Sequence, residues 1–149
     1  MVFIVKKFNI MLLLLLVTTL SFGQVKGTKN FTITPQTVIK TNLPKQASCL
    51  FEIQRILRER FGQSAIMGGF RAKGNSVIEL WTDFDIKGKE HYILDISANK
   101  LSIRGATQKA LLHGLKTLDR ILQYDINNTK NKQIVPVRID DASATVIQP

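Results

Sequence analysis

Cysteine, tryptophan and proline are scarce in this chain of 149 residues, which has one, one and four of them. The single cysteine, Cys49, allows no disulfide within the chain, so folding must rely on an ordinary hydrophobic core. The motifs HExxH, CxxC, GxxxxGK[ST] and GxSxG do not occur. The common metal, redox, nucleotide and acyl-transfer signatures therefore give no evidence of an active site.

Acidic residues are also few. The sequence holds 11 Asp and Glu against 21 Lys and Arg, a formal net charge of +10. A basic chain is compatible with nucleic acid, anionic polymers or membrane surfaces as partners. The basic residues are scattered, however, without a run of five. We interpret them as a solvated surface and predict no nucleic-acid partner.

The longest apolar run is too short to cross a bilayer. It covers residues 10–20, whereas a spanning helix needs ~20 apolar residues. Lys6 and Lys7 precede it, and Ser21-Phe22-Gly23 follows it. This order predicts a signal peptide over residues 1–23, cleaved after Gly23, and export to the periplasm or the cell exterior. No stable membrane anchor is expected.

Two amphipathic helices dominate the remaining sequence. Residues 45–61 place apolar side chains at helical spacing, and Gly62 is positioned to end that helix in a left-handed cap. A second helix is predicted over residues 107–123, with Thr107 as its N-cap. Gly114 lies beside its leucine stripe and favours close packing against a sheet.

Alternating apolar residues predict several strands around these helices. They cover residues 31–34, 37–40, 65–67, 77–81, 92–96, 101–104 and 134–139. The three strands from 77 to 104 are expected to form an antiparallel meander, and Pro136 favours an edge position for the last strand. The prediction is an α+β fold, with two helices on one face of a mostly antiparallel sheet.

The expected domain covers residues 31–142. A flexible lead-in is predicted over residues 24–30, a polar loop over 125–132 and a tail over 143–149.

No combination of reactive side chains convincingly predicts an active site. Cys49 is flanked by Leu50 and Phe51 and is interpreted as a core residue. The chain has only two histidines: His91 begins a strand, and His113 lies at the border of an apolar helix face. We therefore predict no catalytic, cofactor-binding or metal-binding residue, and no cofactor.

Two acidic pairs are weak candidates. Asp140 and Asp141 are adjacent in an extended segment, so they should point to opposite sides of the strand. Asp83 and Asp85 lie on one side of a loop, but two carboxylates without a third ligand make a weak cation site.

The segment Tyr92–Gln123 reads YILDISANKLSIRGATQKALLHGLKTLDRILQ. It resembles the accessory, non-catalytic N-terminal domain of bacterial-type family 20 β-N-acetylhexosaminidases. Gly114, Thr117 and Leu118 match that family's helix motif, and Val135–Ala142 is similar to its following strand. The sequence departs from the family at Ala110, at His113 and at Ser143, which replace a glycine, an aromatic residue and a proline.

The resemblance implies a context of amino-sugar glycoside hydrolysis. The family's catalytic part is a (β/α)8 barrel that follows this domain, and a barrel needs about 250 residues. Seven residues follow Ala142, so no barrel residue can be assigned here. We expect a truncated or accessory chain that is inactive alone and has a barrel as its partner, in cis or in trans.

Two other functions remain open. The first is a stand-alone binding module. An RNA-binding sheet is disfavoured because the aromatic RNP1 pattern is missing, whereas a carbohydrate or other anionic polymer fits better, with Trp81, Phe84 and Tyr92 as stacking candidates. Core packing is an alternative role for Tyr92. The second is a small independent hydrolase, which lacks a nucleophile, a base and an orienting group.

Overall fold

The computed structural model describes residues 29–142. The predicted signal peptide, the tail and all but the last two residues of the lead-in lie outside the described residues. In chain order the elements are β1 (Phe31–Thr32), β2 (Val38–Thr41), α2 (Ser48–Phe61), β3 (Ile66–Met67), β4 (Val77–Thr82), β5 (Tyr92–Ile96), β6 (Lys100–Gly105), α3 (Gln108–Tyr124), α4 (Ile126–Lys130), β7 (Gln133–Ile134) and β8 (Val137–Asp141).

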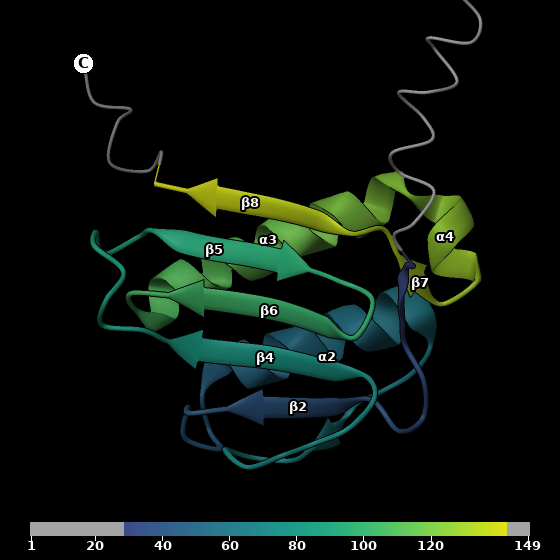
Figure 1. Cartoon of the computed structure of the whole chain (residues 1–149), viewed down its shortest axis with the longest axis horizontal. Helices are drawn as coiled ribbons and strands as arrows, with labels where there is room; N and C mark the ends of the chain where they lie inside the picture. Colours follow the sequence, from purple (N-terminus) through teal and green to yellow (C-terminus); the bar gives the residue numbers. More distant parts are fainter. Residues whose placement is uncertain (1–28, 143–149) are drawn as a thin grey trace, which may run out of the picture.

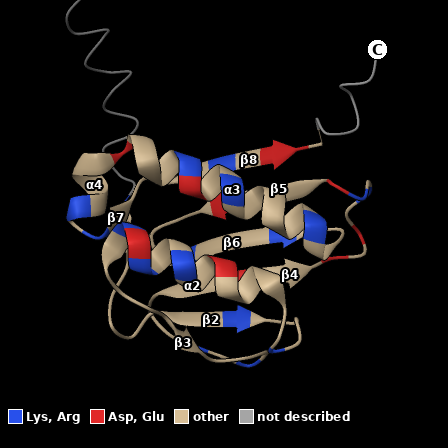
Figure 2. Ribbon diagram, turned by 180° about the vertical axis from the view of Figure 1, so that it is seen from behind, with Lys and Arg blue, Asp and Glu red and all other residues tan. Residues whose placement is uncertain are grey.

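A six-stranded sheet forms one layer, in the order β3-β2-β4-β6-β5-β8. Helices α2 and α3 lie side by side across one face of it, and no helix of residues 29–142 covers the other face (Figures 1 and 2). The predicted α+β class, with two helices on one face, is therefore confirmed.

The sheet is mixed, and the predicted meander is wrong in one respect. Strands β5 and β6 form the expected antiparallel hairpin. However, β4 pairs with β6 in parallel and does not pair with β5, so β6 lies between them. Strand β2 is parallel to both β3 and β4. Alternation shows which side chains face the core, but it does not identify the neighbouring strand.

Both helices begin and end close to their predicted bounds. Gly62 adopts φ 65° at the end of α2 and returns its N–H to the Arg58 carbonyl. A left-handed residue here satisfies the last carbonyls of the helix, and glycine adopts this conformation without strain. At the start of α3 the Thr107 hydroxyl accepts the Ala110 N–H at 3.1 Å, which confirms the predicted cap.

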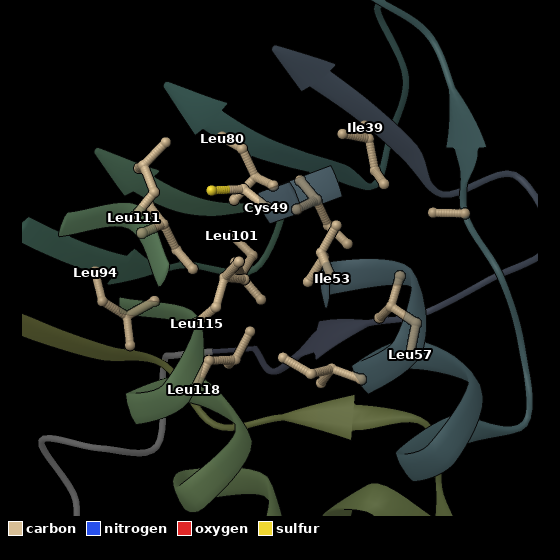
Figure 3. Close-up of a cluster of buried hydrophobic side chains, with 14 of the residues drawn as sticks. Ile39, Cys49, Ile53, Leu57, Leu80, Leu94, Leu101, Leu111, Leu115 and Leu118 are labelled. Carbon is tan, nitrogen blue, oxygen red and sulfur yellow. The ribbon is translucent and has the colours of Figure 1, made fainter. Parts of the chain in front are cut away.

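The core lies between the sheet and the two helices (Figure 3). Ile53 and Leu57 of α2 meet Leu115 and Leu118 of α3 over Leu101 of β6, and all five are at most 1% exposed. Gly114 is also buried, and a Cβ there would come within 2.6 Å of Ile103 Cγ2. This confirms that Gly114 brings α3 close to the sheet.

Two predictions near the end of the domain are wrong. The predicted loop 125–132 contains the short helix α4, in which Asp125 accepts two bonds from the Asn128 amide and its carbonyl accepts the Thr129 hydroxyl. The predicted strand 134–139 is divided in two. Strand β7 pairs with β1, and β8 pairs with β5 at the sheet edge. Pro136 lies between them and has no N–H to offer to a ladder.

Among residues 29–142, no helix is both long and apolar enough to cross a membrane.

Candidate functional site

The adjacent acids Asp140 and Asp141 point to opposite sides of β8, as predicted. The Asp140 carboxylate forms an ion pair with His91 on the open face of the sheet. The Asp141 carboxylate instead accepts a hydrogen bond from the Tyr92 hydroxyl at 3.1 Å. The two carboxylates therefore have different partners and cannot act together on one substrate atom in this arrangement.

His91 links β8 to the loop before β5. Its Nε2 faces Asp140, and its Nδ1 lies 2.8 Å from the Lys87 carbonyl. The bond to Asp140 and then the bond to Lys87 raise the pKa of His91 above its usual value. The imidazole is therefore held by groups that favour its charged form.

The Asp83 carboxylate is held by two neighbours within its own loop and sheet. Its carboxylate accepts the Asp85 N–H at 2.9 Å and forms an ion pair with Arg104. These two interactions lower the pKa of Asp83. Within residues 29–142, no three His, Cys, Asp or Glu side chains gather to hold a metal ion.

Cys49 is a core residue, as the sequence indicates. It is fully buried in the first turn of α2, and its Sγ lies 3.4 Å from the Gln108 carbonyl (Figure 3). Burial raises the pKa of the thiol, which makes it a poor nucleophile. His113 is half-buried on α3, in a shallow depression that also contains Glu90 and Lys116.

The uncovered face of the sheet carries a hollow of about 360 Å³, here called the open-face hollow. Its lining contains one aromatic ring and both positively and negatively charged side chains, which come from five strands and the loop after β4. The lining residues are Lys40, Glu79, Trp81, Asp83, Ile93, Asp95, Lys100, Ser102, Arg104 and Arg138.

The charges in the open-face hollow form a paired network. Glu79 lies 3.8 Å from Lys40 and 3.5 Å from Lys100, and the Ser102 hydroxyl donates to it at 3.4 Å. Arg138 contacts Asp95 at 2.9 Å. These pairs hold long side chains in defined positions on an exposed surface, although each contributes at most ~1 kcal/mol to stability.

Trp81 lines the open-face hollow, and Phe70, which lines a neighbouring pocket, packs against the Trp81 ring. The Phe70 and Trp81 ring centroids are 5.1 Å apart and the rings are tilted by 42°. Lys40 Nζ lies 5.9 Å from the Trp81 centroid. The sequence pointed to Trp81 but not to Phe70, because Phe70 reaches Trp81 from a glycine-containing loop with no strand or helix pattern. Phe84 is 88% exposed and Tyr92 is buried, so Tyr92 is a core residue.

The outer surface of the helix layer is also charged (Figure 2). Arg55 of α2 contacts Glu52 at 2.6 Å and Glu59 beside it, and it reaches Asp119 of α3 at 3.4 Å. Arg60 contacts Asp119 at 2.8 Å. Asp119 therefore joins the two helices. Partial burial is the largest single influence and acts to raise the pKa of Asp119, but the bonds and charges of Arg60 and Arg55 together lower it.

Comparison with known proteins decides the family. The model of glycosyl hydrolase family 20, domain 2, matches residues 23–142. The chain belongs to this family. The described residues thus form the accessory N-terminal domain of a family 20 protein, as the resemblance implied. A comparison with curated protein sequences finds no match.

Solved structures similar to this domain come from several bacteria. A Streptomyces plicatus β-hexosaminidase, solved with its product GlcNAc, is 20% identical with a TM-score of 0.59, over 77% of this chain and 23% of that one. A Flavobacterium johnsoniae chitobiase is 26% identical with a TM-score of 0.52, over 76% and 18%. A Bacteroides fragilis β-N-acetylhexosaminidase is 12% identical with a TM-score of 0.56, over 77% and 22%. The chain spans about a quarter of the length of such structures or less.

Proposed function

We propose that this domain supports a catalytic barrel that hydrolyses β-linked N-acetylhexosamines, and that the chain has no such activity alone. The family match over residues 23–142 is the observation that carries the proposal. The matched part makes up 23% of the S. plicatus β-hexosaminidase and 18% of the F. johnsoniae chitobiase, so most of each of those proteins lies outside it and leaves room for a catalytic part. The separate partners of Asp140 and Asp141 support the inactivity of this chain.

One end of the sandwich is suited to contact such a barrel. Strands β2, β4, β6 and β8 all finish there, α3 begins there, and the chain continues from Ala142 at the same end (Figure 1). Phe51 in the first turn of α2 is 64% exposed, and Phe84 in the loop after β4 is 88% exposed. Exposed aromatics at this end of the sandwich are typical anchors of an interface.

A domain exchange tests this proposal. Residues 24–142 would replace the equivalent domain of the F. johnsoniae chitobiase. Hydrolysis of a chromogenic N-acetylglucosaminide and thermal unfolding would be compared with those of the barrel alone. We expect the hybrid to be active and its barrel to unfold at a higher temperature. The chain alone should give no turnover.

Matched variants locate the contact. Phe51→Ser in the hybrid should lower the unfolding temperature of the barrel. Tyr124→Ser is the control, because Tyr124 is 81% exposed at the opposite end of α3. A hybrid barrel no more stable than the barrel alone, next to a folded domain, would contradict the supporting role. Turnover by the chain alone would contradict its proposed inactivity.

We also propose that the protein is exported, with cleavage after Gly23. Lys6 and Lys7, the apolar run and the small residues at 21 and 23 support this. N-terminal sequencing of exported material should start at Gln24, and a retained Met1 would contradict cleavage.

A further inference from the structure

The open-face hollow has the composition of a saccharide site. Sugars present both apolar C–H faces and hydroxyl groups that donate and accept hydrogen bonds. Trp81 of its lining and Phe70, which packs against Trp81 from outside the hollow, offer an aromatic surface, and Phe70 is 62% exposed. Beside the rings lie ammonium and guanidinium donors and carboxylate acceptors. The volume of about 360 Å³ falls within the ~300–1,000 Å³ range of small-ligand sites.

The polar side chains of the hollow are held in place before any ligand binds. Glu79 is fixed from both sides by Lys40 and Lys100, and Arg104 is fixed by Asp83. An ammonium group has three protons and a carboxylate has four lone-pair positions, so each paired group keeps capacity for a hydroxyl. Preorganised groups of this kind lose little conformational entropy on binding.

The charge balance in the hollow points to a neutral ligand. Its lining has four cationic and three anionic side chains. A sulfated, phosphorylated or otherwise anionic polymer would gain little net attraction here, because Glu79, Asp83 and Asp95 repel it and offset most of the pull of the four cations. The high basic content of the whole chain is therefore not concentrated here, and a neutral sugar meets no such penalty.

We propose that the open-face hollow binds a neutral oligosaccharide, with one pyranose ring against Phe70 and Trp81 and its hydroxyls bonded to Glu79, Lys100 and Arg104. This site lies on the sheet face opposite the helix layer, and the loop after β4 borders both it and the proposed barrel contact. The site is inferred from this geometry alone. Only the choice of N-acetylglucosamine oligomers as the first probe rests on the proposed function.

The chain provides its own reporter for the test. Trp81 is its only tryptophan, so the emission spectrum of the purified chain reports on the open-face hollow. Titration with the N-acetylglucosamine tetramer should give a saturable shift in emission that persists in 0.5 M salt, about the level at which weak surface ion pairing is screened. Cellotetraose and heparin are the neutral and anionic comparison probes.

Variants with matched controls assign the binding residues. Phe70→Ala and Arg104→Gln should each raise the dissociation constant about tenfold. Phe84→Ala removes an exposed aromatic outside the hollow, and Lys109→Gln removes a cation that pairs with Glu90 on another surface. These two variants should bind like the wild-type chain. Circular dichroism would confirm that all four are folded.

Each outcome supports or contradicts the site. Binding of either neutral tetramer, weakened by Phe70→Ala and Arg104→Gln only, supports it. No emission shift with either tetramer at millimolar concentration contradicts it, as does binding of heparin alone that salt abolishes. Equal losses in the control variants would also contradict it. A hybrid that is active and stabilised but shows no sugar binding would refute this site and leave the barrel-supporting role intact.

Discussion

The hydroxyl of Tyr92 donates a hydrogen bond to the Asp141 carboxylate, 3.1 Å away, at the residue where β8 ends. The same hydroxyl lies 2.6 Å from Thr117 Oγ1 on α3. A phenol has one proton, so Thr117 donates to Tyr92 while Tyr92 donates to Asp141. Burial is the main cause that raises the pKa of Tyr92, which keeps this proton in place. The chain of bonds fastens the end of the last strand to the helix layer.

Tyr92→Phe should therefore destabilise the domain. The variant keeps the buried ring but removes the hydroxyl that joins Thr117 and Asp141, and we expect a loss of about 1 kcal/mol in the free energy of unfolding. Urea unfolding followed by circular dichroism measures it. Tyr124→Phe is the control, because Tyr124 is 81% exposed and its change should stay within ~0.5 kcal/mol. Equal stabilities of the two variants would show that the bonds to Tyr92 are not stabilising.

The sequence predicts the individual helices and strands of this fold better than it predicts which strands pair with each other. The leucine stripe of α3, its Thr107 cap and the Gly62 cap of α2 are each determined by residues a few positions apart. The parallel pairing of β4 with β6 depends on the path of the chain between them, which alternation does not record. Phe70 was missed for the same reason, since its contact with Trp81 joins a loop to a strand.

The ion pair between His91 and Asp140 should make stability depend on pH. Asp140 raises the pKa of His91 in the folded state above its usual value of about 6.5. The contribution is therefore fully present below about pH 6.5 and is lost as the pH rises through the folded pKa. Both side chains are partly exposed, so we expect only about 0.3–0.5 kcal/mol.

Asp140→Asn tests this contribution. The variant should be less stable than the wild-type chain at acidic pH and equally stable at alkaline pH, by urea unfolding. An NMR titration should show a lower pKa for His91 in the variant. Asp85→Asn removes the same charge from the loop before β5 and should leave the pKa of His91 nearly unchanged. A pKa of His91 that does not move in Asp140→Asn would contradict the assignment.

Cys49 should be protected from thiol reagents in the folded chain. Its side chain is fully buried, and burial raises the thiol pKa, so the reactive thiolate is scarce. Labelling with a disulfide reagent should be at least about 100-fold slower than in denaturant, because it requires local opening. A Ser48→Cys, Cys49→Ala double variant moves the thiol to the exposed neighbouring position and should react quickly. Fast labelling of native Cys49 would show that the start of α2 opens readily.

Gly114→Ala should destabilise the domain, although alanine is usually more favourable than glycine inside a helix. In an exposed helix this change gains about 1 kcal/mol. Here the new Cβ would lie 2.6 Å from Ile103 Cγ2 and 3.1 Å from Tyr92 Cδ2, so α3 must move away from the sheet. Overpacking of this kind costs about 1–3 kcal/mol, and we expect a net loss in the free energy of unfolding.

Lys116→Ala is the control for this variant, because it gains helix propensity at an exposed position of the same helix. Its stability should stay within ~0.5 kcal/mol of the wild-type value. Ile103→Leu in the Gly114→Ala background should recover part of the loss, because leucine lacks the Cγ2 methyl that the new Cβ meets first. A Gly114→Ala chain at least as stable as the wild type would mean that Ile103 and Tyr92 move aside without cost, and that the close approach of α3 to β6 does not depend on glycine.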